Sequence, residues 1–126
     1  MASRLVERLD AAIATAEDPL QRECLKAERA GALARHGLLD DARFALAGLR
    51  SQAQRRRSPR LAAWVALVDG QIDHFVSITP KAMDKFRQAH SLAVEAGDAD
   101  LQAIALGWMA TRNFNASRPR ICFDRL

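Results

Sequence analysis

The sequence predicts an all-α protein of about six helices, arranged as antiparallel hairpins that stack into a short superhelix. Ala, Leu and Arg dominate its 126 residues, whereas Tyr is absent and Gly and Pro are sparse, a composition that favours helices. Between the prolines and glycines, apolar residues recur at steps of three and four, the period of a helix with one buried face. A chain of this length supports one compact domain or one short stack of repeats.

Capping residues and prolines mark the starts of the predicted helices. A Ser, Thr or Asp side chain at a helix start can accept a hydrogen bond from the unpaired backbone N–H groups of the first turn. A proline directly after it suits the first helical position, because proline has no N–H to leave unpaired. This pair opens three helices, at Asp18-Pro19, Ser58-Pro59 and Thr79-Pro80, and Asp98 caps the sixth. Gly37 and Gly97 are typical stops for the second and fifth helices.

The predicted helices follow one another with short connections, so neighbours must pack antiparallel. Residues 117–126 contain a proline and three arginines without a period. We therefore expect a helical domain over residues 1–116 and a loose C-terminal tail over 117–126. The expected helices are about Ser3–Glu17, Pro19–His36, a third from Leu39 or Asp40, Pro59–Phe75, a fifth ending at Ala96, and about Ala99–Phe114.

Two predicted hairpins carry spaced small and large apolar residues that suit close helix packing. Ala82, Phe86 and Ala89 form a small–large–small series in one hairpin, and Leu46 follows Ala42 in the other. The small residues allow two helices to approach, and the large side chain fills the space that is left.

These hairpins resemble tetratricopeptide repeats, helix–turn–helix units of about 34 residues that stack into a superhelix. The resemblance covers roughly residues 20–114. The distance from Ala42 to Ala82 exceeds the family's period, so we expect Gln54–Ser58 to loop out. In the middle repeat Asp73 stands where the family prefers an aromatic residue, and a shift of one residue would place Val65, Val68 and Ile72 in the core instead.

The resemblance implies that the first helix of each hairpin lines a concave groove that binds a peptide or helix of a partner protein. The residues that would lie on or near this groove are Arg35, Trp64, Gln71, His74, Trp108 and Arg112. The family's carboxylate clamp needs Asn where this chain has Glu28, Val68 and Ala105, which argues against a chaperone-tail receptor.

No spacing of reactive side chains predicts an enzyme, a metal site or a cofactor. His36, His74 and His90 fall on three different helices, and no two of them have ligand spacing. Cys24 and Cys122 are far apart, and Cys24 is expected to be a small core residue.

The most compact acidic cluster with a histidine is Asp69, Asp73 and His74. A carboxylate could orient an imidazole for general-base catalysis. No nucleophile, oxyanion hole or phosphate loop accompanies it. We therefore interpret it as a hydrophilic helix face.

The formal net charge of +4 is concentrated in one run, Arg55, Arg56, Arg57 and Arg60. The default interpretation is a solvated loop between repeats, and the functional one is a basic loop for an acidic partner. Nucleic-acid binding is less favoured because neither stacking aromatic residues nor a helix–turn–helix motif accompanies the run. No signal peptide and no apolar run of about 18 residues is found, so we expect a cytoplasmic protein without a membrane segment.

The favoured function is therefore a protein–protein interaction scaffold whose partner carries acidic groups. The alternative is a regulatory or oligomerisation segment of a larger bacterial signalling or transcription-regulatory protein, since Ala93–Leu106 looks like repeats of such proteins. In that case a homo-oligomer would form through the helix Ala99–Phe114. Leu101, Ile104, Ala105 and Trp108 on this helix have no following helix in the sequence to cover them.

Overall fold

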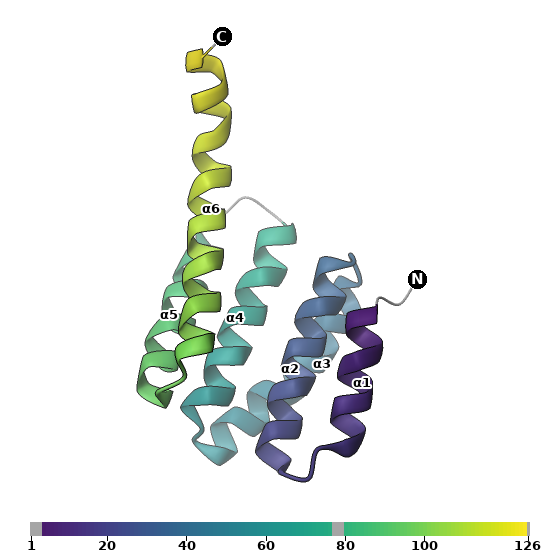
Figure 1. The fold of residues 1–126 in the computed structure, drawn as a ribbon. Coiled ribbons are helices and arrows are strands. Elements are labelled where there is room, and N and C mark those ends of the chain that lie inside the picture. Colours follow the sequence, from purple (N-terminus) through teal and green to yellow (C-terminus); the bar gives the residue numbers. More distant parts are fainter. Residues whose placement is uncertain (1–3, 77–79, 126) are drawn as a thin grey trace.

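The computed structural model describes residues 4–76 and 80–125, with side chains described as far as Arg112. Within these residues the chain forms six helices and no strand, so the predicted all-α architecture is confirmed (Figure 1). The helices are α1 (Arg4–Thr15), α2 (Pro19–Arg35), α3 (Leu39–Arg56), α4 (Pro59–Val76), α5 (Lys81–Ala96) and α6 (Ala99–Arg125).

Three helices begin at the capping residues that the sequence predicted. Asp18 Oδ1 accepts from Leu20 N at 3.1 Å at the start of α2. Ser58 Oγ accepts from Leu61 N at 3.2 Å, and Asp98 Oδ1 from Leu101 N at 3.0 Å. Each bond satisfies one of the N–H groups that a helix start leaves unpaired. At the fourth start, Thr79 lies outside the described residues and Pro80 itself precedes α5.

The two predicted glycine stops are also confirmed. Gly37 has φ 82° and Gly97 has φ 68°, a left-handed conformation that costs glycine little because it lacks Cβ. In the first of these turns, Leu38 N donates to Leu33 O and Gly37 N to Ala34 O, both at 3.0 Å. These bonds pair carbonyl groups at the end of α2 and reverse the chain for α3.

Neighbouring helices pack as antiparallel hairpins in two layers. In Figure 1, α2, α4 and α6 lie side by side at the front, with α3 and α5 behind them. The contacts agree with this view, since α4 touches both α2 and α6 in the front layer and both α3 and α5 behind it. Helix α1 packs on α2, and α4 is therefore the centre of the fold.

The predicted seam of α5 is buried completely. Ala82, Phe86 and Ala89 are all 0% exposed. The Phe86 ring lies against Gly70 of α4, where a Cβ atom would stand only 2.7 Å from Phe86 Cε1. Because glycine has no side chain, α4 and α5 approach closely enough for the ring to fill the space between them.

Helix α4 contributes to two core clusters because helices cover it on several sides. Val65, Val68 and Ile72 pack in the cluster formed with α1, α2 and α3. Ala63 and Leu67 pack in the second cluster, with α5 and α6. Val65, Val68 and Ile72 therefore lie in the core, but so do Ala63 and Leu67, and the repeat register of this helix stays a prediction.

The predicted loop over Gln54–Ser58 is wrong. Helix α3 continues through Arg56, and the chain turns at Arg57, which has φ 49° and is the end of the helix. The extra residues lengthen α3 instead, because no Gly or Pro stands between Gly48 and Pro59 to end the helix earlier.

The predicted end of the sixth helix at Phe114 is also wrong, since α6 runs to Arg125. Residues 115–118 include no glycine or proline, so nothing in the local sequence stops the helix there. The backbone of 117–125 is helical rather than irregular. The division into a domain over 1–116 and a tail over 117–126 stays a prediction.

The contact between Gly70 and Phe86 predicts a specific loss of stability in Gly70→Ala. The new methyl group would overlap a rigid ring, so we expect the free energy of unfolding to fall by about 1–3 kcal/mol despite alanine's better helix propensity. Gly107→Ala is the matched control, since a Cβ there meets nothing within 4 Å, and it should gain up to about 1 kcal/mol. Urea unfolding of both variants measures the difference, and equal values would contradict this account of the seam.

Candidate partner-binding face

The structure brings all six predicted groove residues to the three helices of the front layer. Arg35 lies on α2; Trp64, Gln71 and His74 lie on α4; and Trp108 and Arg112 lie on α6. We call the surface that these helices share the α2–α4–α6 face. Because α2, α4 and α6 are alternate helices along the chain, residues far apart in sequence lie on one face.

Trp108 is the centre of an aromatic cluster on this face. Its ring stacks on buried Phe86 with centroids 5.7 Å apart and an interplanar angle of 27°. His74 and Phe75 meet the same ring edge to face, at 5.6 Å and 6.0 Å. Such stacked and edge-to-face contacts are favourable beyond the area they bury. Trp108 is half-buried, so part of its ring packs on the core and part remains accessible at the surface.

Two arginines flank this cluster in different environments. Arg35 is exposed, with its guanidinium carbon 5.9 Å from the centroid of the Trp108 ring, within the range of a cation–π contact. Arg112 is only 8% exposed, and its Nη1 lies 3.4 Å from His74 Nδ1. Because arginine can only donate, Nδ1 of His74 must accept, and the imidazole proton then resides on Nε2.

The surroundings of His74 favour its neutral form. Burial lowers the pKa of His74 below its ordinary value, and the positive charge of Arg112 lowers it further. The side chain therefore contributes ring contacts and an acceptor to the face, without adding to its charge.

Arg35, Trp64 and Gln71 line a small cleft of about 100 Å³ between α2 and α4, to which Glu28 and Ile104 also contribute. Burial raises the pKa of the Glu28 carboxyl group, whereas the nearby charge of Arg35 opposes this shift. The cleft exists partly because α2 has Gly31 opposite Gln71; a Cβ there would stand 2.6 Å from Gln71 Oε1.

The predicted residues differ in how much of each a partner could reach. Arg35 is exposed, and Trp64, His74 and Trp108 are half-buried. Gln71 is only 2% exposed and, like Arg112, belongs to the packed interior. These two side chains therefore offer little surface to a partner, although Gln71 lines the cleft beside Arg35. Their assignment to a binding groove stays a prediction.

Phe75 belongs to the aromatic cluster, although the sequence analysis did not select it. It is 42% exposed and contacts both His74 and Trp108. In the sequence, the only indication was that Phe75 directly follows His74, one of the predicted groove residues. Its position beside a tryptophan from another hairpin could be known only from the tertiary structure.

Helix α6 is covered more fully than the sequence suggested. Leu101 and Ala105 are buried in the second core cluster because α5 packs against them. Ile104 and Leu106 remain 38% and 49% exposed. The expected uncovered apolar face is thus reduced to these two side chains and part of Trp108, within the described residues.

The arginine run does not form a free basic loop. Arg56 forms an ion pair with Glu23 of α2, with Nε 2.6 Å from Oε2 and Nη2 donating to Oε1 at 3.0 Å, and Arg60 pairs with Asp98 at 3.2 Å. Arg55 and Arg57 are exposed. Two of the four arginines are therefore engaged in ion pairs with other parts of the fold.

The acidic cluster with a histidine is divided between two faces of α4. Asp69 and Asp73 both pair with Lys85 of α5, at 3.0 Å and 2.6 Å, whereas His74 contacts Trp108 and Arg112. Burial lowers the pKa of Lys85, but its hydrogen bonds to Asp73 and Asp69 outweigh this and raise the pKa above its ordinary value. The two carboxylates are thus engaged in an ion-pair network and do not orient the imidazole.

Cys24 is a buried free thiol, as expected for a small core residue. Burial raises its pKa to about 11, so little reactive thiolate is present near neutral pH. Cys122 lies outside the described side chains. Among the described residues, no group of three or more His, Cys, Asp or Glu side chains is placed to hold a metal ion.

None of the helices in residues 4–76 and 80–125 combines the length and the apolar composition needed to cross a membrane. Comparisons of the chain found no matching family model, no matching curated protein and no matching solved structure.

The stack of Trp108 on Phe86 predicts that Trp108 stabilises the fold as well as forming the surface. We expect Trp108→Ala to lower the free energy of unfolding by about 2–3 kcal/mol, because the Phe86 ring loses its covering partner. Trp108→Phe should recover part of this loss, since it keeps an aromatic ring in place. Chemical denaturation of both variants tests this, and wild-type stability in Trp108→Ala would show that the tryptophan is not part of the core.

The neutral state of His74 predicts a pH-dependent contribution to stability. Its pKa in the folded chain is below the ordinary value of 6.5, so the unfolded chain takes up the proton first as the pH falls. Stability is therefore retained above pH 6.5 and lost as the pH falls through the folded pKa. His74→Gln should lose less stability than wild type between about pH 8 and about pH 5. Parallel urea titrations of the two proteins at both pH values measure this, and identical losses would contradict it.

Proposed function

We propose that this chain is a protein-interaction scaffold of the tetratricopeptide type, not an enzyme, and that it binds a segment of a partner polypeptide on the α2–α4–α6 face. The small–large–small seam of α5 and the order of the hairpins support this family assignment. The acidic cluster with a histidine gives no support to a catalytic alternative, because its carboxylates pair with Lys85.

The proposal rests mainly on the position of Trp108. Its ring is supported from the core by Phe86 and remains only half-buried, with exposed Arg35 beside it. Tryptophan and arginine are enriched among the residues that contribute most binding energy in protein interfaces. A ring already fixed by its neighbours loses little conformational freedom when a partner covers it.

The charges on the face favour acidic groups in the partner. Arg35 is the exposed cation beside the ring, and the neighbouring His74 is neutral. A carboxylate of the partner placed near Arg35 would gain from its charge. Apolar contact with Trp108, Phe75 and Trp64 would supply the remainder of the affinity.

Nucleic acid is a less favoured partner for the same chain. Arg56 and Arg60 are engaged by Glu23 and Asp98, so only part of the basic run is free to neutralise phosphate groups. The aromatic residues of the α2–α4–α6 face contact one another and the core, instead of forming a series of separate stacking platforms.

Charge reversal of Arg35 tests this function without disturbing the core, since the residue is exposed. Arg35→Glu should reduce capture of protein partners from the native lysate, and reduce the affinity of a purified partner by at least about tenfold. The matched control is Arg55→Glu, which makes the same charge change at an exposed position outside the face. If Arg35→Glu and wild-type baits recover the same partners in equal amounts, the proposed binding face is wrong. Arg112→Glu would be a poor probe because that side chain is buried.

A further inference from the structure

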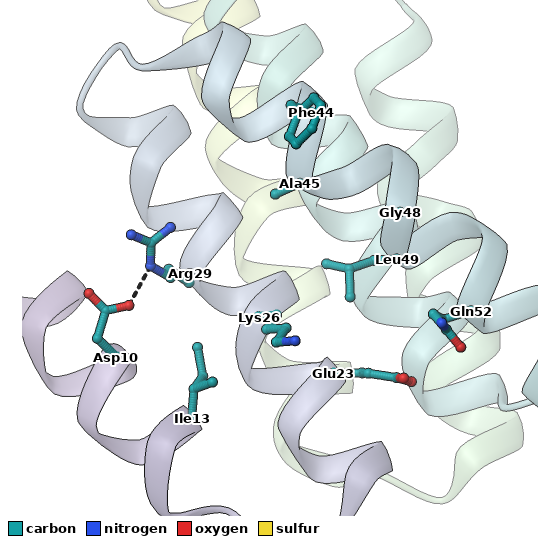
Figure 2. A pocket seen from close by; sticks show the side chains of 10 residues that line it. All are labelled: Asp10, Ile13, Glu23, Lys26, Arg29, Phe44, Ala45, Gly48, Leu49 and Gln52. Atoms are coloured by element: carbon teal, nitrogen blue, oxygen red, sulfur yellow. Dashed lines mark hydrogen bonds and ion pairs between the residues drawn. The ribbon is translucent and has the colours of Figure 1, made fainter.

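A second surface feature lies on other helices, in the groove that α1 and α3 form across α2. This α1–α3 groove has a volume of about 540 Å³. Figure 2 shows Ile13 on the α1 side and Phe44, Ala45, Gly48 and Leu49 along the α3 side. The groove is open and partly apolar, and it shares no lining residue with the cleft beside Arg35.

Phe44 is the most exposed large apolar side chain among the described residues, at 86%. The buried side chains of α3 are Ala42, Leu46, Leu49 and Ala53, so Phe44 lies off that face. In Figure 2 its ring stands at one end of the α1–α3 groove. Removing such a ring from water is strongly favourable, and the fold of a single chain does not achieve it.

Gly48 lies one helical turn after Phe44 and also lines the groove. A Cβ atom there would meet nothing within 4 Å, so the folded chain does not need a glycine at this position. Almost any other residue would make α3 more stable, because glycine in a helix interior is unfavourable. The missing side chain leaves the groove open directly beside the projecting ring.

The charged residues of the groove are balanced. Asp10 and Glu23 oppose Lys26 and Arg29 in its lining. Asp10 pairs with Arg29 at 2.6 Å, and Glu23 pairs with Arg56 at 2.6 Å. A strongly acidic or basic partner would therefore gain little here, whereas an identical surface meets no excess of like charge.

We propose that two copies of this chain associate through the α1–α3 groove, with Phe44 of each copy inserted beside Gly48 of the other. The surface is self-complementary, because one patch carries both the projecting Phe44 ring and, beside Gly48, a hollow that can receive the same ring of a second copy. That is the requirement for a twofold symmetric interface, in which each contact occurs twice. The proposal goes beyond the function of the α2–α4–α6 face and does not depend on it.

The test is the molar mass of the full chain in solution, measured by sedimentation equilibrium over a wide concentration range. Wild type should show a reversible monomer–dimer equilibrium. Phe44→Ser should weaken it at least about thirtyfold, the change expected when a residue central to an interface is removed. Because Phe44 is 86% exposed, this variant should keep the melting temperature that wild type has under conditions where it is monomeric.

Gly48→Gln separates association from stability. We expect its monomer to melt at a higher temperature than wild type, since glutamine is the better helix former, while its dimer dissociates at least about tenfold more readily because the hollow is filled. Gly107→Gln on α6 is the matched control, as a Cβ there also meets nothing within 4 Å. It should stabilise the helix and leave the dimer intact.

Three results would overturn the proposal. One is a wild-type chain that stays monomeric up to about 1 mM, the range of very weak association. Another is a dimer that Phe44→Ser or Gly48→Gln leaves unchanged. The third is a dimer that is lost in Leu106→Ser, on the exposed part of α6, and not in Phe44→Ser, which would place self-association on the sixth helix instead.

Discussion

The close approach of α4 and α5 at Gly70 is the constraint on which the rest of the molecule depends. The Phe86 ring fits against α4 only because residue 70 has no side chain, and the alanines on either side of Phe86 let the two helices meet along their length. On another side the same ring supports Trp108 of α6. One buried side chain thus fixes the position of three helices relative to one another. Since α4 also packs on α2 and α3, a substitution that forces α4 and α5 apart would disturb the packing of both core clusters.

The candidate binding face is a consequence of that seam. Trp108 is held at the surface because Phe86 lies beneath it, and Trp108 in turn brings His74, Phe75 and Arg35 together from α4 and α2. A face built on the core is rigid, which suits recognition of a partner with little loss of conformational freedom. It also means that the same side chains serve stability and recognition. Exposed Arg35 is the residue at which the two roles are best separated, because its contact is with the outer part of the cluster.

Charged side chains also join neighbouring helices, beside their apolar contacts. Arg29 pairs with Asp10 between α1 and α2, Arg56 with Glu23 between α3 and α2, and Lys85 with Asp69 and Asp73 between α5 and α4. These pairs range from exposed to partly buried, and exposed pairs each contribute little to stability. Ion pairs also divide the basic run, because Arg56 pairs with Glu23 and Arg60 with Asp98 while Arg55 and Arg57 remain exposed.

The sequence by itself determined the helices, most of their ends and the seam residues. These features depend on local chemistry: Asp18, Ser58 and Asp98 cap the helix that follows each of them, Gly37 and Gly97 adopt the left-handed turn, and the apolar period selects the buried side of each helix. The tertiary structure alone decided that Gln71 and Arg112 are buried and that Phe44 is not covered within its own chain. It also decided that Asp73 faces Lys85 while His74 faces Trp108. Each of these outcomes depends on which residue of a distant helix occupies the facing position, and the spacing of residues along one helix does not contain that information.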